Sequence, residues 1–133
     1  MRVRKVVTSL GALMAVAAAG VLTAPAAQAA DHISRTAEGG RVSAFVYQQT
    51  GVGLTVSGVL NDTVLNDNRP TTLQVRSQVW GDSEWGPADN IGWTYDRYQG
   101  PLMWLGTSFT IRLQLRVCSY GCSSWQTTPW YKF

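Results

Sequence analysis

The segment from Ser108 to Cys118, SFTIRLQLRVC, alternates between apolar and polar side chains. Its odd positions from 109 to 117 carry Phe, Ile, Leu, Leu and Val, and the even positions between them carry Thr, Arg, Gln and Arg. Successive side chains of a β-strand point to opposite faces of the sheet, so this period of two predicts a strand with one face on a core and one in water. The chain is therefore expected to build a sheet that is covered on one side only.

The same alternation recurs in other segments, which are separated by turn residues. It is clearest in TTLQVRSQVW (71–80), where Leu73, Val75 and Val79 are expected to face inward and Trp80 outward. The further candidates are RVSAFVYQQ (41–49), GLTVSGVL (53–60), IGWTYDRY (91–98) and CSSWQTTPWY (122–131). No long segment after position 30 combines helical periodicity with a cap. Short strands at this spacing predict an all-β fold, an antiparallel β-sandwich.

The N-terminus has the three regions of a secretory signal peptide. Basic residues at positions 2, 4 and 5 precede an apolar run from 6 to 22, and AQA at 27–29 matches the small-residue cleavage pattern. We therefore expect residues 1–29 to be removed on export, residues 30–40 to be a flexible lead-in, and residues 41–133 to form the sandwich domain. Cleavage leaves 8 basic and 8 acidic residues, so the charge of the remaining chain gives no reason to expect nucleic acid as a partner. The exported protein is expected to be extracellular, monomeric and free of the membrane.

The two cysteines, Cys118 and Cys122, are expected to form a disulfide in the oxidising environment outside the cell. Facing each other across a three-residue turn, they would close a hairpin. Pairing outward from the bridge sets Val117 opposite Ser123 and Leu115 opposite Trp125. The disulfide then lies on the polar face, and Trp125 is predicted to lie in the core. Trp104, in the short apolar segment GPLMWLG, is also predicted to be a core residue.

The hairpin sequence LRVCSYGCSSW (115–125) resembles the last hairpin of bacterial fibronectin type III domains, in which an RVC-like run turns and returns through CSxW. The resemblance implies an immunoglobulin-like or fibronectin-III-like sandwich. The precursor as a whole resembles the small exported proteins that are common in actinobacteria, many of which have no characterised function. This second resemblance implies export.

The side chains available do not favour catalysis. The only histidine, His32, falls in the expected lead-in, where it cannot be held against a nucleophile. Both cysteines are expected to be oxidised, and there is no G-x-S-x-G or phosphate-binding glycine loop. The acidic residues do not have the spacing of a calcium loop. The sequence therefore predicts a protein that is not an enzyme and holds no metal or other cofactor.

The aromatic residues are the remaining candidates for function, because all six tryptophans lie between positions 80 and 130. The segment VWGDSEWGPADNIGW (79–93) combines three of them with acids and an amide. Trp85 has two interpretations: it covers one end of the sandwich, or it belongs to an exposed aromatic platform. The residues proposed for that platform are Trp80, Asp82, Glu84, Trp85, Asp89, Asn90, Trp93 and Tyr98.

Such a platform predicts an extracellular binding or interaction module. Sugar rings stack on exposed aromatic side chains, and Trp and Tyr also anchor protein interfaces, so the ligand is a glycan or a protein. One alternative is a secreted inhibitor of an extracellular hydrolase, which would present Ser119-Tyr120-Gly121. Another is a structural protein of the cell surface.

Overall fold

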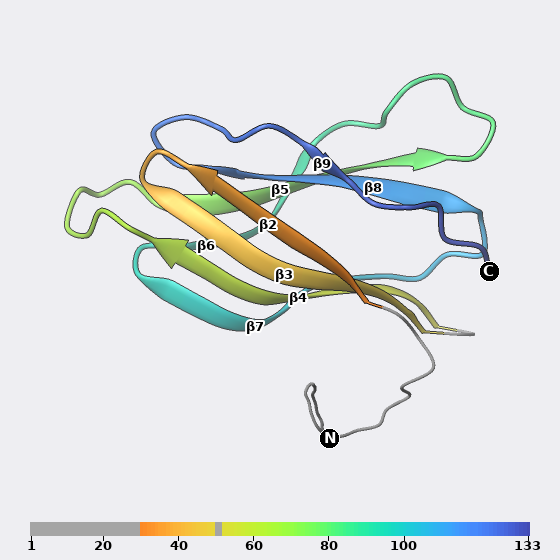
Figure 1. Cartoon of the computed structure of the whole chain (residues 1–133), viewed down its shortest axis with the longest axis horizontal. Helices are drawn as coiled ribbons and strands as arrows, with labels where there is room; N and C mark the ends of the chain where they lie inside the picture. The colour runs from red at the N-terminus through yellow and green to blue at the C-terminus, as the bar shows by residue number, and fades with distance from the viewer. Residues whose placement is uncertain (1–29, 50–51) are drawn as a thin grey trace.

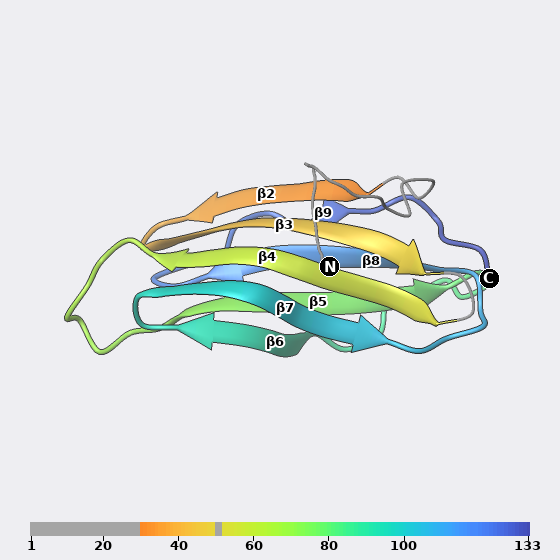
Figure 2. The same ribbon diagram turned by 90° about the horizontal axis from the view of Figure 1, so that it is seen from below.

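The computed structural model describes residues 30–49 and 52–133 of the chain. Their strands form two antiparallel sheets of four strands that lie one on the other, as Figures 1 and 2 show in two orientations. The first sheet contains, in spatial order, β2 (Asp31–Ala37), β3 (Gly40–Gln49), β4 (Gly53–Asp62) and β7 (Arg97–Leu105). The second contains β6 (Asp89–Thr94), β5 (Thr71–Val79), β8 (Ile111–Cys118) and β9 (Gln126–Thr127). The prediction of an all-β antiparallel sandwich is confirmed.

The core lies between the two sheets and is built from the inward positions of each strand. In β8 the burial alternates residue by residue as the sequence predicts, and Leu113, Leu115 and Val117 have no exposed surface. In β5 the inward Leu73 and Val75 are likewise buried. Burying each such side chain contributes roughly 1.5–3 kcal/mol, so this shared apolar layer is what holds the sheets together.

Residues 31–37 form β2, so the expectation of a flexible lead-in is wrong for them. The strand pairs with β3 along its whole length, from Asp31 opposite Val46 to Ala37 opposite Gly40. Ile33 is 1% exposed within the core, and the hydroxyl of Tyr131 donates a hydrogen bond to Asp31. The inward-facing positions of β2 include an arginine. The segment therefore has too few apolar residues to show the period of two.

The predicted strand IGWTYDRY is two strands joined by a tight turn. β6 ends at Thr94 and β7 begins at Arg97, and Thr94 Oγ1 accepts a hydrogen bond from the amide of Asp96 (3.1 Å). β7 then continues through GPLMWL, where Trp104 pairs with Thr55 and faces away from the core. Trp104 is 62% exposed, so its predicted core position is wrong. Its neighbours Met103 and Leu105 take the inward positions instead.

The hairpin after β8 changes register, and this moves Trp125 out of the core. The amide of Ser123 donates to the carbonyl of Val117 (2.8 Å), as predicted from the turn. Further along, however, Leu115 pairs with Gln126 rather than with Trp125. One additional residue has entered the returning strand, and a shift by one residue exchanges the two faces. Trp125 therefore lies on the outer face of the sheet, which corrects its predicted core position.

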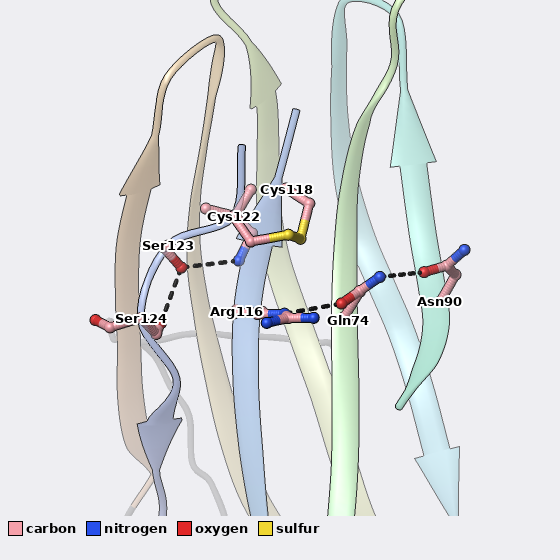
Figure 3. Close-up of a disulfide and its surroundings, with 8 residues drawn as sticks. Gln74, Asn90, Arg116, Cys118, Cys122, Ser123 and Ser124 are labelled. Atoms are coloured by element: carbon pink, nitrogen blue, oxygen red, sulfur yellow. Dashed lines mark hydrogen bonds between the residues drawn. A yellow bond between two sulfur atoms is a disulfide. The ribbon is translucent and has the colours of Figure 1, made fainter. Parts of the chain in front are cut away.

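The disulfide between Cys118 and Cys122 is present and lies on the outer face, as the parity of Cys118 predicts. Figure 3 shows it next to the hydrogen bonds that cross the same sheet. At the tip of the hairpin, the amide of Tyr120 donates to the carbonyl of Glu38 (3.1 Å) in the turn between β2 and β3. The bridge thus fixes a turn that also joins the two sheets.

In the part of the chain that the structure describes, no helix has the length and hydropathy that crossing a membrane requires.

Candidate functional site

The outer face of the sheet β6-β5-β8-β9 carries a continuous stack of aromatic and guanidinium groups. The segment after β5 extends past the end of that strand and then turns back over the sheet, on the side away from the other sheet (Figure 1). The amide of Gly86 donates to the carbonyl of Ser77 (2.8 Å), which fixes the returning segment beside β5. This places Trp85 on the outer face. Trp85 is therefore neither a cover over the end of the core nor a free aromatic ring.

We call this stack the Trp–Arg ladder. Its members, in order along the sheet, are Arg116, Trp125, Arg76, Trp85, Arg112, Trp130 and Trp80. The guanidinium carbon of Arg76 lies 4.3 Å from the ring centre of Trp125 and 5.5 Å from that of Trp85. The guanidinium carbon of Arg112 lies 5.0 Å from the ring centre of Trp85 and 4.5 Å from that of Trp130. The guanidinium carbon of Arg116 lies 4.3 Å from the ring centre of Trp125. Each contact is within the range of a cation–π interaction.

Glutamine side chains hold the ladder to the sheet. The Nε atoms of Arg76, Arg112 and Arg116 donate to the side-chain oxygens of Gln114 (2.8 Å), Gln78 (2.9 Å) and Gln74 (2.8 Å) respectively. The partners pair directly across β5 and β8, so each arginine has a glutamine on the neighbouring strand. These acceptors are uncharged, so the three positive charges are not neutralised by these contacts.

One end of the ladder is exposed. Trp80 packs edge-on against Trp130, with ring centres 4.9 Å apart, and 66% of its surface is accessible. The prediction that Trp80 faces outward is confirmed. Asp82 and Glu84 follow it in the returning segment, where both side chains are exposed.

A shallow groove of about 400 Å³ lies where the edge strands β6 and β7 of the two sheets come together. We call it the edge groove. Its lining residues are Asn90, Ile91, Gly92, Trp93, Tyr98, Pro101 and Leu102. Trp93 comes from one sheet and Tyr98 from the other, and both rings are exposed (63% and 38%). The hydroxyl of Tyr98 donates to the carbonyl of Pro101 (2.5 Å), so the ring is held in place.

The proposed site residues therefore do not form one platform. Trp80 follows the last residue of β5, whereas Trp93 pairs with Thr72 at its first residues. Seven or eight residues of strand separate these two positions, a distance of about 25 Å. Trp80, Asp82, Glu84 and Trp85 gather at one end, and Asn90, Trp93 and Tyr98 gather at the edge groove. Asp89 is exposed at the start of β6.

A hydrogen-bond chain connects the edge groove to the Trp–Arg ladder (Figure 3). Asn90 Oδ1 accepts from Gln74 Nε2 (3.1 Å), and Gln74 Oε1 accepts from Arg116 Nε (2.8 Å). The polar side of the edge groove is thus joined to the first arginine of the ladder.

Sequence reasoning missed the arginines of the ladder, although a signal was present. The outward positions of β5 carry Gln74, Arg76 and Gln78, and those of β8 carry Arg112, Gln114 and Arg116. The two patterns, Gln-Arg-Gln and Arg-Gln-Arg, are complementary when the strands are antiparallel neighbours. Recognising this required knowing that β5 and β8 pair.

The hairpin tip forms a separate polar contact. The hydroxyl of Tyr120 donates to Asp67 Oδ2 (2.5 Å), and the guanidinium carbon of Arg69 lies 4.8 Å from the ring centre of Tyr120. The hydrogen bond from Tyr120 is the main reason why the pKa of Asp67 is lowered, and the same bond raises the pKa of Tyr120.

His32 lies in β2 rather than in a loose terminus. Its Nε2 is 2.9 Å from Ser43 Oγ, and its ring stacks against Phe45 with centres 4.9 Å apart. All three side chains are exposed on the outer face of the first sheet. In the described residues no group of three or more His, Cys, Asp or Glu side chains has an arrangement that could hold a metal ion.

Comparison with protein-family models, with curated proteins and with solved structures finds no match to this chain.

Proposed function

We propose that the protein is a secreted, non-enzymatic module that binds an extracellular glycan at the edge groove. Export is supported by the signal-peptide pattern of residues 1–29, and the disulfide between Cys118 and Cys122 is compatible with it. A non-enzymatic role is supported by the lining of the edge groove, which among the described residues includes no histidine, cysteine or acidic side chain; His32 and Ser43 lie on an exposed sheet face elsewhere.

One observation carries this proposal: Trp93 and Tyr98, from different sheets, line the same groove as the amide of Asn90. Aromatic faces offer apolar area to the C–H groups of a sugar ring at little entropic cost. An amide can bond to the hydroxyl groups around that ring. Asn90 already uses its side-chain oxygen to accept from Gln74, which orients its NH₂ group as a donor for a ligand.

The test compares exposed tryptophans that differ in position. Trp93→Ala removes a ring of the edge groove, and Trp104→Ala removes an equally exposed ring (62% against 63%) on the other sheet. The purified protein and both variants are titrated against a glycan array, and hits are quantified by calorimetry. We expect Trp93→Ala to weaken binding about tenfold or more, because a stacked aromatic contributes roughly 0.5–1.5 kcal/mol in addition to the effect of the apolar area it buries. Trp104→Ala should leave the affinity unchanged.

Equal affinities for the two variants would place the ligand elsewhere on the surface. Tyr98→Phe provides a second check, since it keeps the ring and removes only the hydroxyl that bonds to Pro101. Binding of a protein but of no glycan in the same screen would replace the proposed ligand class with a protein interface.

The alternative of a hydrolase inhibitor has less support from the geometry. An inhibitory loop presents its side chains to the enzyme, whereas the hydroxyl of Tyr120 bonds to Asp67 and its ring lies under Arg69. A structural role at the cell surface would be favoured if the protein fractionated with the cell wall and bound no soluble ligand.

A further inference from the structure

We infer that the bound glycan is acidic, and that its carboxylates bind to the guanidinium groups of Arg116, Arg76 and Arg112 on the Trp–Arg ladder. This inference rests on the proposed function, because it names the class of glycan that enters the edge groove.

The first argument is the orientation of the guanidinium groups. In Arg76 and Arg116 only Nε bonds to a glutamine of the sheet. Among the described residues, no Nη atom of Arg76 or Arg116 makes a side-chain hydrogen bond, and none of these atoms is among the fully buried polar atoms without a partner. A guanidinium held by its Nε edge presents its two Nη groups as a planar fork, and this fork matches the two oxygens of a carboxylate. Arg112 donates hydrogen bonds from Nε and Nη2 to Gln78, so its Nη1 is the nitrogen that remains for a ligand.

The second argument is charge. Each of the three arginines has an uncharged carboxamide as its acceptor and an aromatic face as its neighbour. Stacking removes water from the flat sides of the guanidinium without cancelling its charge, and so strengthens a hydrogen bond made at its edge. The face therefore carries three fixed positive groups that a polyanion would neutralise.

The third argument is alignment. The three arginines occupy successive rows of the β5–β8 pair, in the order Arg116, Arg76, Arg112. Rows on one face of a strand are about 6.7 Å apart, so the two intervals of this line extend over about 13 Å. The line is preorganised by the ladder, which lowers the entropy cost of binding. It begins beside Asn90, because Gln74 bonds to both Asn90 and Arg116 (Figure 3). A chain lying in the edge groove can thus continue over the arginines.

Between the arginines, the same contacts leave no free aromatic face for a nucleic acid base. Binding of single strands needs free aromatic faces on which bases stack. Trp85 lies between Arg76 and Arg112, and Trp125 lies between Arg76 and Arg116, so both rings are already covered by guanidinium groups. An acidic glycan needs only the outward edges of the arginines.

The experiment uses purified protein and three probes that carry carboxylates: oligogalacturonate, alginate and hyaluronate. Each is matched by its methyl ester, which has the same backbone and no charge. We expect at least one acid to bind about tenfold or more tightly than its ester, because hydrogen bonds between charged groups are stronger than those to a neutral ester. The affinity should fall as NaCl is raised, since exposed charges are screened by salt. Dextran sulfate and a thymidine oligonucleotide test sulfate and phosphate as sources of the negative charge.

The variants separate the ladder from general electrostatics. Arg116→Gln and Arg76→Gln should each weaken binding of the acid about tenfold, whereas Arg41→Gln, on the outer face of the other sheet, should not. Arg76→Lys keeps the charge and loses the fork, and should give an intermediate affinity. If a variant unfolds, NMR titration of the wild-type protein with the acid tests the inference instead. The indole N–H signals of Trp85 and Trp125 should shift, and that of Trp104 should not.

The outcomes distinguish the two proposals. Equal binding of acid and ester, with Trp93→Ala still harmful, would overturn the inference and leave the proposed function standing. If none of the three acids binds and a neutral glycan does, the inference is likewise overturned and the proposed function stands. Preference for the oligonucleotide or for dextran sulfate over every carboxylate would also overturn the inference. Absence of binding to any glycan would reject the proposed function itself.

Discussion

The guanidinium carbon of Arg76 lies 4.3 Å from the ring centre of Trp125. This contact joins the C-terminal segment to the outer face of β5, although β9 itself contains only Gln126 and Thr127. Backbone hydrogen bonds beyond β9 also attach this segment, from the amide of Thr128 to the carbonyl of Leu113 (2.9 Å) and in both directions between Ile111 and Tyr131 (3.0 and 2.8 Å). The stacking of Trp125 adds a side-chain attachment on the outer face. The ladder is therefore part of what folds the C-terminal segment, as well as a candidate binding surface.

Trp125→Ala should destabilise the protein by about 2–3 kcal/mol. It removes two cation–π contacts of roughly 0.5–2 kcal/mol each, together with the packing of a half-buried ring. Trp104→Ala is the matched control, because Trp104 is exposed on the other sheet and should change stability by less than about 0.5 kcal/mol. Urea unfolding followed by circular dichroism measures both. Equal losses would mean that the ladder contacts are not stabilising.

Gly58→Ala should destabilise the protein by roughly 2–3 kcal/mol, because extra atoms in a packed site force the backbone to shift. A methyl group at this position would lie 2.3 Å from the carbonyl oxygen of Ser43 and 2.8 Å from Cβ of Ala44 on β3. Glycine inside a strand often marks a close approach of two backbones, and these distances show one at Gly58. The register irregularity of β4 and β7 falls between Val56 and Ser57.

Gly121→Ala is the control for Gly58→Ala. A methyl group at Gly121 would have no atom within 4 Å, so the same chemical change should be nearly neutral there. Thermal unfolding of both variants is the measurement, and a mild effect at Gly58 would show that β3 and β4 can separate without loss of packing.

The bond between Tyr120 and Asp67 predicts a stability difference that depends on pH. Because the pKa of Asp67 is lowered in the folded protein, its contribution is complete above the unfolded value of about 3.9 and is lost as the pH falls through the folded pKa. Tyr120→Phe removes the hydroxyl and keeps the ring under Arg69. The gap in melting temperature between wild type and Tyr120→Phe should therefore be constant from pH 5 to pH 7 and should shrink below about pH 4.

Tyr98→Phe is the control for this pH dependence, since the hydroxyl of Tyr98 bonds to a backbone carbonyl that does not titrate. Its melting temperature should follow that of the wild type in parallel over the same range. A gap for Tyr120→Phe that stays constant down to pH 2 would show that Asp67 is not its source.

Replacing both cysteines, Cys118→Ser with Cys122→Ser, should lower stability by about 2 kcal/mol and leave the fold in place. The bridge closes a ring of five residues, and the entropy that so short a loop removes from the unfolded chain is small. Chemical denaturation with and without reductant checks this value. A global loss of structure on reduction would mean that the bridge supports the sandwich and not only the turn.

Local pattern was sufficient for part of the fold. The period of two in SFTIRLQLRVC and TTLQVRSQVW reports which side chains meet the core, because alternation follows from strand geometry alone. Both segments contain strands, β8 and β5, with the predicted residues inside, although the first begins only at Ile111 and leaves Phe109 exposed. The hairpin disulfide followed from the expected export of a chain with two cysteines, and their spacing indicated the turn.

The tertiary structure decided where the aromatic side chains lie. Trp125 changes face because one additional residue enters the returning strand, and Trp104 faces outward because it pairs with Thr55. Neither the added residue nor the pairing is encoded in a local period. The ladder requires β5 and β8 to be neighbours and the segment after β5 to turn back over them, since its members come from distant parts of the chain. The sequence by itself determined which residues can alternate in a strand, and only the packing of the strands determined which tryptophan meets which arginine.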